Sequence, residues 1–241
     1  MRVLFVGDVH ANTAFLKEVY SMAERYEVDR VFQVGDFGWW PRMPTGERFI
    51  NAASSLATKS NIPLIFVDGN HEDHSQLPHD GDVMQELKPG LHYLPRGVVI
   101  TLGDARVLGH GGAVSVDQAW RTEHIDWFRE EVANHASFLK SIDAKNVHVV
   151  VAHDVPAGTD LKLTFPVTPS IEAHCKSHRD SMLEILEAHD PYLWVAGHYH
   201  QRVTQRIGNT TVEVLDGDGT TNLDRSTMLV EDFGSWSTIR P

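Results

Sequence analysis

Five short apolar segments constrain the fold of this 241-residue chain more than any other feature of its sequence. Each is rich in Val, Ile, Leu or Phe, and each is followed abruptly by Gly, Asp or His. Continuous rather than alternating apolarity is typical of strands that are covered on both faces. Because helical segments separate several of them, the sequence predicts an α/β fold with layers of strands and helices. The five expected strands are Val3–Val6, Val31–Val34, Leu64–Val67, Val147–Ala152 and Leu193–Ala196.

The remaining segments predict helices, hairpins and one long loop. Residues with helical spacing predict helices, with Thr13 and Asp180 among the capping residues, at Thr13–Tyr26, Glu47–Thr58, Glu123–Ser141 and Arg179–His189. Hairpin strands separated by Gly-containing turns are expected at Leu91–Leu94, Val98–Leu102, Arg106–Gly109, Arg202–Ile207 and Thr210–Leu215. The segment Asp160–Ser170 holds two prolines and little periodicity, so we expect an exposed loop that overhangs the site.

Length and composition indicate a single domain over residues 1–241, without repeats or a linker. The net charge of -12 disfavours an extended groove for duplex nucleic acid, but it permits a nucleotide or a strand end held by metal ions. The single cysteine, Cys175, can form no intramolecular disulfide, and we expect it to be inert. The first apolar run is too short for a signal peptide, and no segment approaches a membrane span. We therefore expect a cytoplasmic protein without membrane contact.

A block of polar residues that can bind metal ions lies just beyond each of the five expected strands. Ligands of open α/β sheets bind beyond the carboxyl ends of the strands, so blocks that are distant in sequence are expected to converge. One Asp or His after a strand is weak evidence, but five blocks in succession are hard to obtain by chance. The blocks are Gly7-Asp8-Val9-His10, Gly35-Asp36, Gly69-Asn70-His71-Glu72, His153-Asp154 and Gly197-His198-Tyr199-His200.

The donor types in these blocks predict two divalent metal ions. Mixed nitrogen and oxygen donors without a thiolate suit Mn²⁺, Fe, Zn²⁺, Co²⁺ or Ni²⁺, and we place Mn²⁺ first. Seven donors exceed the need of one tetrahedral ion, which favours two ions that share a bridging carboxylate. Two ions about 3.5–4 Å apart can hold a hydroxide between them and neutralise charge on a phosphoryl transition state. The expected ligands are Asp8, His10, Asp36, Asn70, His153, His198 and His200.

The five blocks resemble the calcineurin-like metallophosphoesterase superfamily. Its pattern is D-x-H, then G-D, then G-N-H-[ED], then a His, then G-H-x-H, and all five blocks occur here in order between Asp8 and His200. The resemblance implies a four-layer α/β/β/α sandwich of two mixed β-sheets flanked by helices. It also implies a role for each matching position. Asp8, His10 and His200 would bind one metal, Asn70, His153 and His198 would bind the other, Asp36 would bridge them, and His71 would protonate the leaving oxygen.

Departures from the family pattern narrow the subfamily. The second block continues as Phe37-Gly38-Trp39-Trp40, whereas phosphoprotein phosphatases carry G-D-x-x-D-R-G and use that Arg to grip phosphate. The stretch from His110 to Asp117, followed by Trp120, Arg121 and Trp127, resembles small prokaryotic and bacteriophage members. Some of those members act on nucleotides, cyclic phosphodiesters or nucleic-acid ends.

We therefore predict hydrolysis of phosphomonoesters or phosphodiesters by direct attack of a metal-bridging hydroxide, with His71, Asp36 and Asn70 as catalytic residues. Nucleotides, cyclic nucleotides and nucleic-acid ends lead the list of small phosphate-ester substrates. The alternatives are a phosphoprotein phosphatase, which the missing Arg disfavours, and a metal-binding scaffold whose turnover is incidental. The sequence leaves the native metal pair, the oligomeric state and the biological substrate open.

Several further residues have two interpretations each. Trp39 and Trp40 either stack on a nucleobase or cap the core or an oligomer contact. Arg121 either grips a phosphate or is a solvated charge. The His110-Gly111-Gly112 stretch either approaches the substrate or forms a plain hairpin loop. Similarly, Glu72 and Asp154 either orient histidine ligands or form surface salt bridges.

Overall fold

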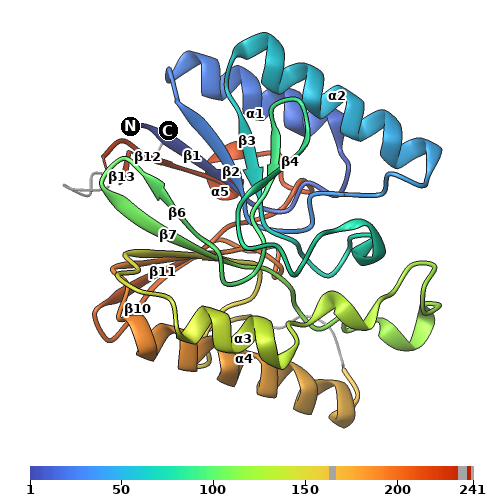
Figure 1. The fold of residues 1–241 in the computed structure, drawn as a ribbon, viewed down its shortest axis with the longest axis vertical. Helices are drawn as coiled ribbons and strands as arrows, with labels where there is room; N and C mark the ends of the chain where they lie inside the picture. Colours follow the sequence, from blue (N-terminus) through green and yellow to red (C-terminus); the bar gives the residue numbers. More distant parts are fainter. Residues whose placement is uncertain (163–166, 233–237, 240–241) are drawn as a thin grey trace.

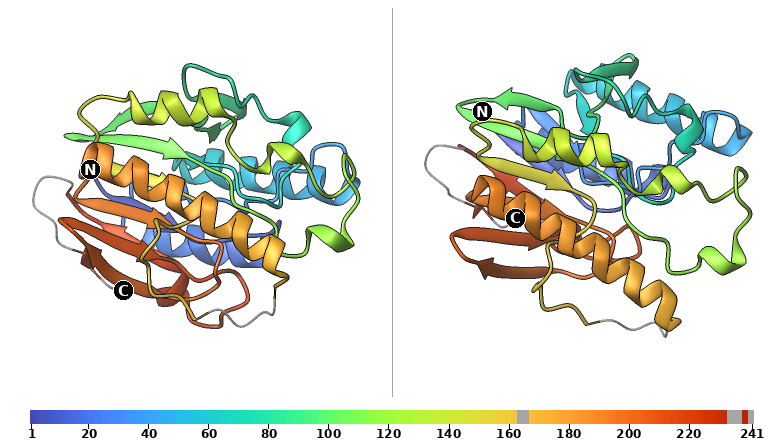
Figure 2. Two further views of the ribbon diagram at one scale, coloured as in Figure 1. Left: turned by 90° about the horizontal axis from the view of Figure 1, so that it is seen from below. Right: turned by 60° about the horizontal axis from the view of Figure 1, so that its bottom comes forward.

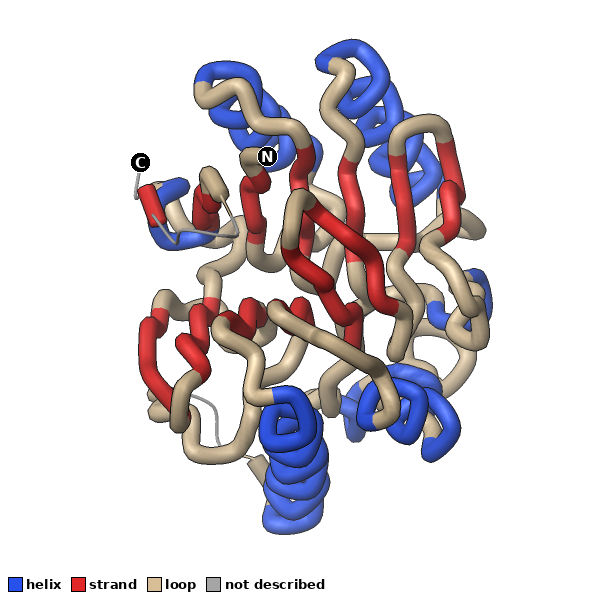
Figure 3. Tube along the Cα trace, turned by 60° about the vertical axis from the view of Figure 1, so that its left-hand side comes forward, coloured by secondary structure: helices blue, strands red, loops and turns tan. Residues whose placement is uncertain are grey.

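The computed structural model describes residues 1–162, 167–232 and 238–239. It is built of two mixed β-sheets that pack face to face and are covered on their outer faces by helices (Figure 1). Figure 3 shows the helices above and below and the strands between them. The predicted four-layer α/β/β/α sandwich is therefore confirmed.

The first sheet has seven strands in the order β13-β12-β1-β2-β3-β5-β4. Strands β1, β2, β3 and β5 run parallel, while β12 and β4 join them antiparallel. The bounds in this spatial order are Thr238–Ile239, Thr227–Val230, Val3–Val6, Arg30–Gln33, Leu64–Phe66, Leu91–Tyr93 and Gln85–Lys88.

The second sheet has six strands in the order β10-β11-β9-β8-β7-β6. Strands β11, β9, β8 and β7 run parallel, and each edge strand is added by an antiparallel hairpin. The bounds in this spatial order are Val203–Ile207, Thr210–Val214, Leu193–Ala196, Val149–Ala152, Ala105–His110 and Val99–Leu102.

Four helices cover the sheets: α1 (Thr13–Arg25) and α2 (Pro44–Ser60) lie on the first, and α3 (His135–Ile142) and α4 (Pro169–His189) lie on the second. Figure 2 shows α3 and α4 side by side on the outer face of the second sheet. Shorter elements are the helix α5 and three 3₁₀ turns, at Leu223–Ser226, His74–Gln76, Gln118–Trp120 and Arg129–Glu131. No helix in these described parts is both long and apolar enough to cross a membrane.

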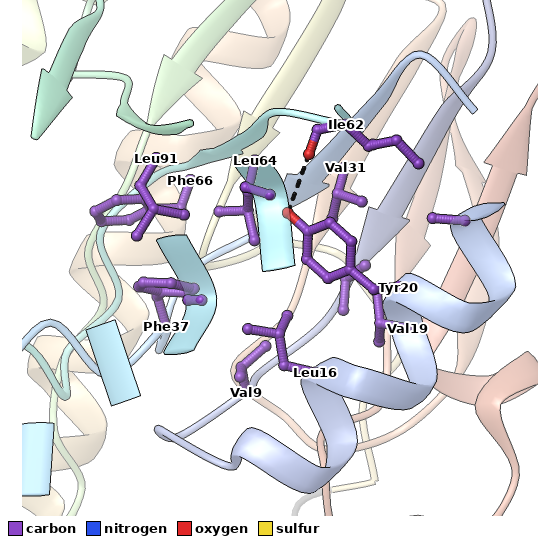
Figure 4. Packing of buried hydrophobic residues seen from close by; sticks show 14 of the residues in the cluster. Val9, Leu16, Val19, Tyr20, Val31, Phe37, Ile62, Leu64, Phe66 and Leu91 are labelled. Atoms are coloured by element: carbon purple, nitrogen blue, oxygen red, sulfur yellow. Dashed lines mark hydrogen bonds between the residues drawn. The ribbon is translucent and has the colours of Figure 1, made fainter. Parts of the chain in front are cut away.

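Alternate residues of each buried strand serve two different apolar layers. In β1, Leu4 and Val6 pack toward α1 and α2, whereas Val3 and Phe5 pack between the two sheets. Successive strand side chains point to opposite faces, so a strand covered on both faces must be apolar throughout. Figure 4 shows the layer under α1, where the Tyr20 hydroxyl donates a hydrogen bond of 3.2 Å to the Ile62 carbonyl.

Two expected helices have different beginnings in the structure. The helix predicted at Glu123–Ser141 is wrong for its first half, because Asn134 caps the helix that begins at His135 and accepts from the Ser137 amide. The helix predicted from Arg179 instead begins at Pro169, inside the segment Asp160–Ser170 that we expected to be a loop; residues 163–166 of that segment lie outside the described residues.

The capping residues and one hairpin also require correction. Helix α1 is capped by Asn12 rather than Thr13, and α4 by Thr168 rather than Asp180, which lies in the middle of that helix. The predicted strand Leu91–Leu94 does not pair with Val98–Leu102. The chain crosses from the first sheet to the second between these two strands, whereas β6 and β7 do form the expected hairpin.

Candidate metal centre

The polar blocks after β1, β2, β3, β8 and β9 converge, although they come from both sheets. One cluster consists of Asp8, His10 and His200, whose potential ligand atoms lie within 4.8 Å of one another. Within it, His200 Nε2 lies 3.0 Å from Asp8 Oδ2. The His10 and His200 rings are 4.9 Å apart between centroids. The three residues predicted for one metal ion are therefore brought together.

A second cluster consists of Asp36, His153 and His198, again within 4.8 Å. Asn70 joins it, since Asn70 Oδ1 lies 3.2 Å from His153 Nε2. The Asn70 amide also donates a hydrogen bond of 3.0 Å to Ser115 Oγ, which fixes its carbonyl oxygen toward the cluster. The residues predicted for the other ion are thus also assembled in one place.

Asp36 links the two clusters. Its Oδ2 lies 3.3 Å from His10 Nε2 and 3.4 Å from His153 Nε2, so one carboxylate oxygen reaches an imidazole of each cluster. Its Oδ1 accepts a hydrogen bond of 2.8 Å from the His71 amide. This position is the one that a bridging ligand requires.

The histidine tautomers suit a cation at each cluster. His153 Nδ1 donates to the Val34 carbonyl at 2.9 Å, and His10 Nδ1 lies 3.0 Å from Asp218 Oδ1. An imidazole that donates through Nδ1 presents its lone pair at Nε2, and in both residues Nε2 faces Asp36. The donor set of carboxylate, imidazole and amide fits the divalent transition metals named above.

The carboxylates of the two clusters also favour positive charge beside them. Burial alone would lower the pKa of His10, but the nearby Asp36 outweighs it and raises that pKa to about 10. Asp36 likewise overcomes burial at His153, whose pKa rises to about 10. Burial would raise the pKa of Asp36, yet the charges of His153 and His71 hold it well below its ordinary value. The site therefore favours ionised carboxylates beside positive charge, which a proton on these histidines supplies and which a metal ion can supply in its place.

The backbone is strained where it presents these side chains. His10, Asp36, His198 and His200 have positive φ angles of 46°, 56°, 68° and 47°. Such angles are unfavourable for non-glycine residues and persist where the surrounding structure enforces them, often at functional sites. Gly35 has a φ of +104°, and a Cβ there would overlap the His153 ring. A glycine is therefore required before Asp36.

His71 lies at the edge of the clusters under the guanidinium of Arg121. Arg121 Nη2 lies 2.9 Å and 3.0 Å from the two ring nitrogens, while His71 Nε2 is 3.9 Å from Asp36 Oδ2. Burial lowers the pKa of His71, and the positive charge of Arg121 adds to that effect against the opposing charge of Asp36.

Arg121 is held in this place by the segment before α3. Its side chain is only 10% exposed, pairs with Asp117 Oδ2 at 2.8 Å and donates to the Asp126 carbonyl at 3.2 Å. The interpretation of Arg121 as a solvated charge is therefore wrong. The sequence alone could not predict that Arg121 contacts His71, because the two residues are 50 positions apart.

A cavity of about 490 Å³ opens over His10, His71 and Arg121. Trp120, 86% exposed, and Trp40 belong to its wall, and Trp40 Nε1 donates to the His71 carbonyl at 2.7 Å. Trp39 is instead buried in the core, so for Trp39 the core interpretation holds. The full lining is His10, Ala11, Gly38, Trp40, His71, Asp117, Trp120, Arg121 and Asp126.

The three remaining expectations concern Glu72, Asp154 and the His110 stretch. Glu72 is buried and accepts from the Phe37 amide at 2.7 Å, and burial followed by the charge of Asp36 raises its pKa to about 8. Asp154 is buried and accepts from His178 Nδ1 and the Tyr199 hydroxyl. Within the described part of the chain, neither forms a surface salt bridge. The His110 stretch does not line the cavity over His71.

Sequence reasoning missed Asp218, which binds His10 Nδ1 and also accepts from Asn12 Nδ2 at 2.8 Å. The signal was present, because Asp216-Gly217-Asp218 follows the apolar end of β11 just as the other blocks follow their strands. It also missed Ser115, which binds Asn70 and carries no strand-end pattern.

A third group of buried residues, Asp68, His74 and His79, also has ligand atoms within 4.8 Å of one another. Arg96 already forms an ion pair with Asp68 Oδ2 there, and the Tyr93 hydroxyl donates to Oδ1 at 2.9 Å. Burial lowers the pKa of His74 to about 3, so its ring is neutral. The group is a structural network centred on an arginine rather than a cation site.

Comparison with known proteins agrees with this arrangement. Residues 1–202 match the calcineurin-like phosphoesterase family, and the chain belongs to that family. A search of curated proteins gave no significant match.

Solved structures share the fold at low sequence identity. The protein TT1561 of Thermus thermophilus aligns with a TM-score of 0.55 and 14% identity, over 90% of this chain and 89% of that one. A novel archaeal phosphodiesterase aligns with a TM-score of 0.50 and 11% identity, over 99% of both chains. GAP50, the anchor in the inner membrane complex of Plasmodium, aligns with a TM-score of 0.50 and 12% identity, over 95% of this chain and 80% of that one.

Proposed function

We propose that this protein hydrolyses phosphate monoesters or diesters with two divalent cations held by the two clusters. The position of Asp36 carries this proposal, since one carboxylate oxygen lies within 3.4 Å of an imidazole nitrogen in each cluster. Asp8, His10 and His200 would hold one cation, Asn70, His153 and His198 the other, with Asp36 shared. When bound, the cations would supply Lewis acidity and would lower the pKa of a water, so that it can lose a proton and become the nucleophile at neutral pH. Mn²⁺ is our first candidate.

We assign His71 and Arg121 to the phosphate, because both line the cavity that also exposes His10. We assign His71 the proton that the leaving oxygen receives, because its ring lies at the rim of the cavity beside the clusters. Arg121 is placed to bind a phosphate oxygen through its guanidinium. A phosphate on Arg121 offsets the charge that lowers the pKa of His71, so His71 holds its proton more readily in the complex.

Nucleotides, cyclic nucleotides and nucleic-acid ends are the proposed substrates. The exposed Trp120 and the partly exposed Trp40 give the cavity aromatic faces on which a base can stack, a contact that contributes about 1–3 kcal/mol. The net charge of -12 favours small phosphate esters over duplexes. A phosphoprotein remains the second candidate substrate. We propose that the protein acts in the cytoplasm, where its single cysteine would remain reduced.

The test is a panel of mono-, di- and cyclic phosphates assayed with Mn²⁺, together with metal analysis of the protein. We expect hydrolysis that Asp36→Asn and His71→Ala each reduce at least 100-fold, whereas His92→Ala, a histidine of β5 outside both clusters, retains activity. Circular dichroism confirms folding of each variant. A protein that binds two metal ions but hydrolyses none of these esters would be a scaffold, and the enzymatic proposal would be abandoned.

A further inference from the structure

Asn70 differs from the other residues of the second cluster because its side chain is an amide. One end of an amide is an oxygen, which can bind a cation, and the other is an NH₂ group, which only donates hydrogen bonds. The two ends have nearly the same size and shape, so packing alone does not choose between them. The hydrogen bonds that Asn70 makes away from the cluster therefore decide whether it can serve as a ligand.

Two buried residues, Ser115 and Glu131, form a series of hydrogen bonds that begins at Asn70. Asn70 Nδ2 donates to Ser115 Oγ at 3.0 Å. Ser115 Oγ donates to Glu131 Oε2 at 2.5 Å, and the Ser115 backbone amide donates to Glu131 Oε1 at 2.9 Å. Ser115 and Glu131 are each only 1% exposed, so bulk water hardly competes for these bonds.

The direction of this series follows from its metal end, and in this respect the inference rests on the proposed function. A cation in the second cluster needs the oxygen of Asn70, so Nδ2 must face Ser115. Ser115 Oγ then accepts from Asn70, and its single proton goes to Glu131, which accepts at both oxygens as a carboxylate. Burial raises the pKa of Glu131 above its ordinary value, and the two hydrogen bonds from Ser115 oppose that rise.

We propose that Glu131 is a positioning residue for the second cation, because through Ser115 it holds the oxygen of Asn70 toward the cluster. Glu131 ends the 3₁₀ turn Arg129–Glu131 and belongs to neither cluster of potential ligand atoms in the described part of the chain. It acts only through the residue between. Replacing an outer residue that orients a metal ligand typically lowers metal affinity about 10- to 100-fold.

The same two residues also close a loop, which suggests a purely structural role as the competing explanation. Ser115 and Glu131 are the ends of the segment 115–131, which carries Trp120 and Arg121 at the cavity over His71. Loop closure would act on the phosphate through Arg121 and would leave metal binding unchanged. Positioning acts on the second cation even when no substrate is present, so metal binding distinguishes the two roles.

The test is a calorimetric titration of the full chain with Mn²⁺ alone. Glu131→Gln keeps the shape of the side chain, but its NH₂ group donates to Ser115 Oγ, so the Ser115 proton turns to Asn70 and attracts the oxygen away from the cluster. We expect Glu131→Gln to weaken about 10- to 100-fold the same one of two bound Mn²⁺ ions that Asn70→Ala weakens. The control Glu213→Gln changes another buried carboxylate, which pairs with Arg202, and should leave both ions unchanged.

Ser115→Ala tests the middle of the series without a change in charge, so it separates orientation of Asn70 from long-range attraction of the cation. The variant keeps the backbone amide that donates to Glu131, and it should weaken the same Mn²⁺ ion. The control Ser141→Ala removes another fully buried hydroxyl, which binds His110, and should have no effect. Ser115→Ala combined with Glu131→Gln should bind no more weakly than the weaker single variant, because both changes break one series. Circular dichroism checks that each variant folds.

Unchanged Mn²⁺ binding in Ser115→Ala or Glu131→Gln, or additive effects of the two changes, would reduce Glu131 to closure of the loop and overturn the proposal. The titration needs no turnover, so it is independent of the proposed hydrolysis. A wild type that binds two Mn²⁺ ions but hydrolyses no ester, with both variants weakened, refutes the hydrolysis and leaves the positioning role in place. A wild type that binds fewer than two Mn²⁺ ions overturns both.

Discussion

Arg96 is the residue whose replacement should most directly test how the interior near the candidate metal centre is stabilised. Its side chain is 2% exposed and forms an ion pair with the fully buried Asp68, to which Nε also donates at 3.0 Å. Nη2 donates further to the Glu130 and Glu131 carbonyls at 2.8 Å and 3.1 Å. Arg96 thus ties the loop before Asn70 to the segment before α3.

Replacement of Arg96 by Met keeps an unbranched side chain but leaves a buried carboxylate without its cation. Burial alone would raise the pKa of Asp68, but the charge of Arg96 outweighs it and holds that pKa far below its ordinary value. Asp68 is therefore ionised at neutral pH when the pair is intact. Removing one partner of a buried ion pair costs about 3–5 kcal/mol, so we expect Arg96→Met to lower the free energy of unfolding by that amount.

A double-mutant cycle with Asp68→Asn measures the coupling. The double variant has no buried charge, so it should be about 2 kcal/mol or more closer to the wild type than the sum of the single variants predicts. Urea unfolding followed by tryptophan fluorescence and by circular dichroism gives the free energies where the two transitions coincide. A loss below about 1 kcal/mol in Arg96→Met, or strict additivity in the cycle, would refute this reasoning.

Three further predictions concern local features. Asn12→Ala removes the α1 cap and should cost about 1 kcal/mol in urea unfolding, whereas Asn12→Ser keeps a capping oxygen without adding a charge beside Asp218 and should cost less. Equal costs would contradict the capping argument. Gly35→Ala should abolish hydrolysis, because the added Cβ would overlap the His153 ring. The control Gly158→Ala also changes a glycine at positive φ, but it lies in open space and should keep activity. Equal losses of activity in the two variants would argue against the overlap. Burial raises the pKa of Cys175 to about 11 from 9.0. Because the thiolate is the reactive form, iodoacetamide should alkylate Cys175 about 100-fold more slowly at pH 7.5 than an exposed thiol, and the rate should rise toward pH 11. Fast alkylation at pH 7.5 would contradict this prediction.

The strand ends were the part of the site that local sequence could predict. A strand covered on both faces must be apolar along its length, so its end is visible where the apolar run stops. The residues that follow it, such as Asp8, Asp36 and His198, have the donor chemistry of metal ligands whatever lies beside them. Order, spacing and donor type were sufficient to select the residues that the structure brings together, and the family resemblance carried by those residues implied the four layers.

The parts that sequence could not predict depend on distant partners. Arg121 is a charged residue in an irregular segment, and only the fold places its guanidinium on His71, 50 positions away. Sequence also could not predict where α3 begins, or that β5 and β6 belong to different sheets, because both depend on tertiary packing. Local chemistry thus determined which atoms can bind metal, and only the fold decided which side chains stand beside them, because burial and pairing are properties of the whole packed chain.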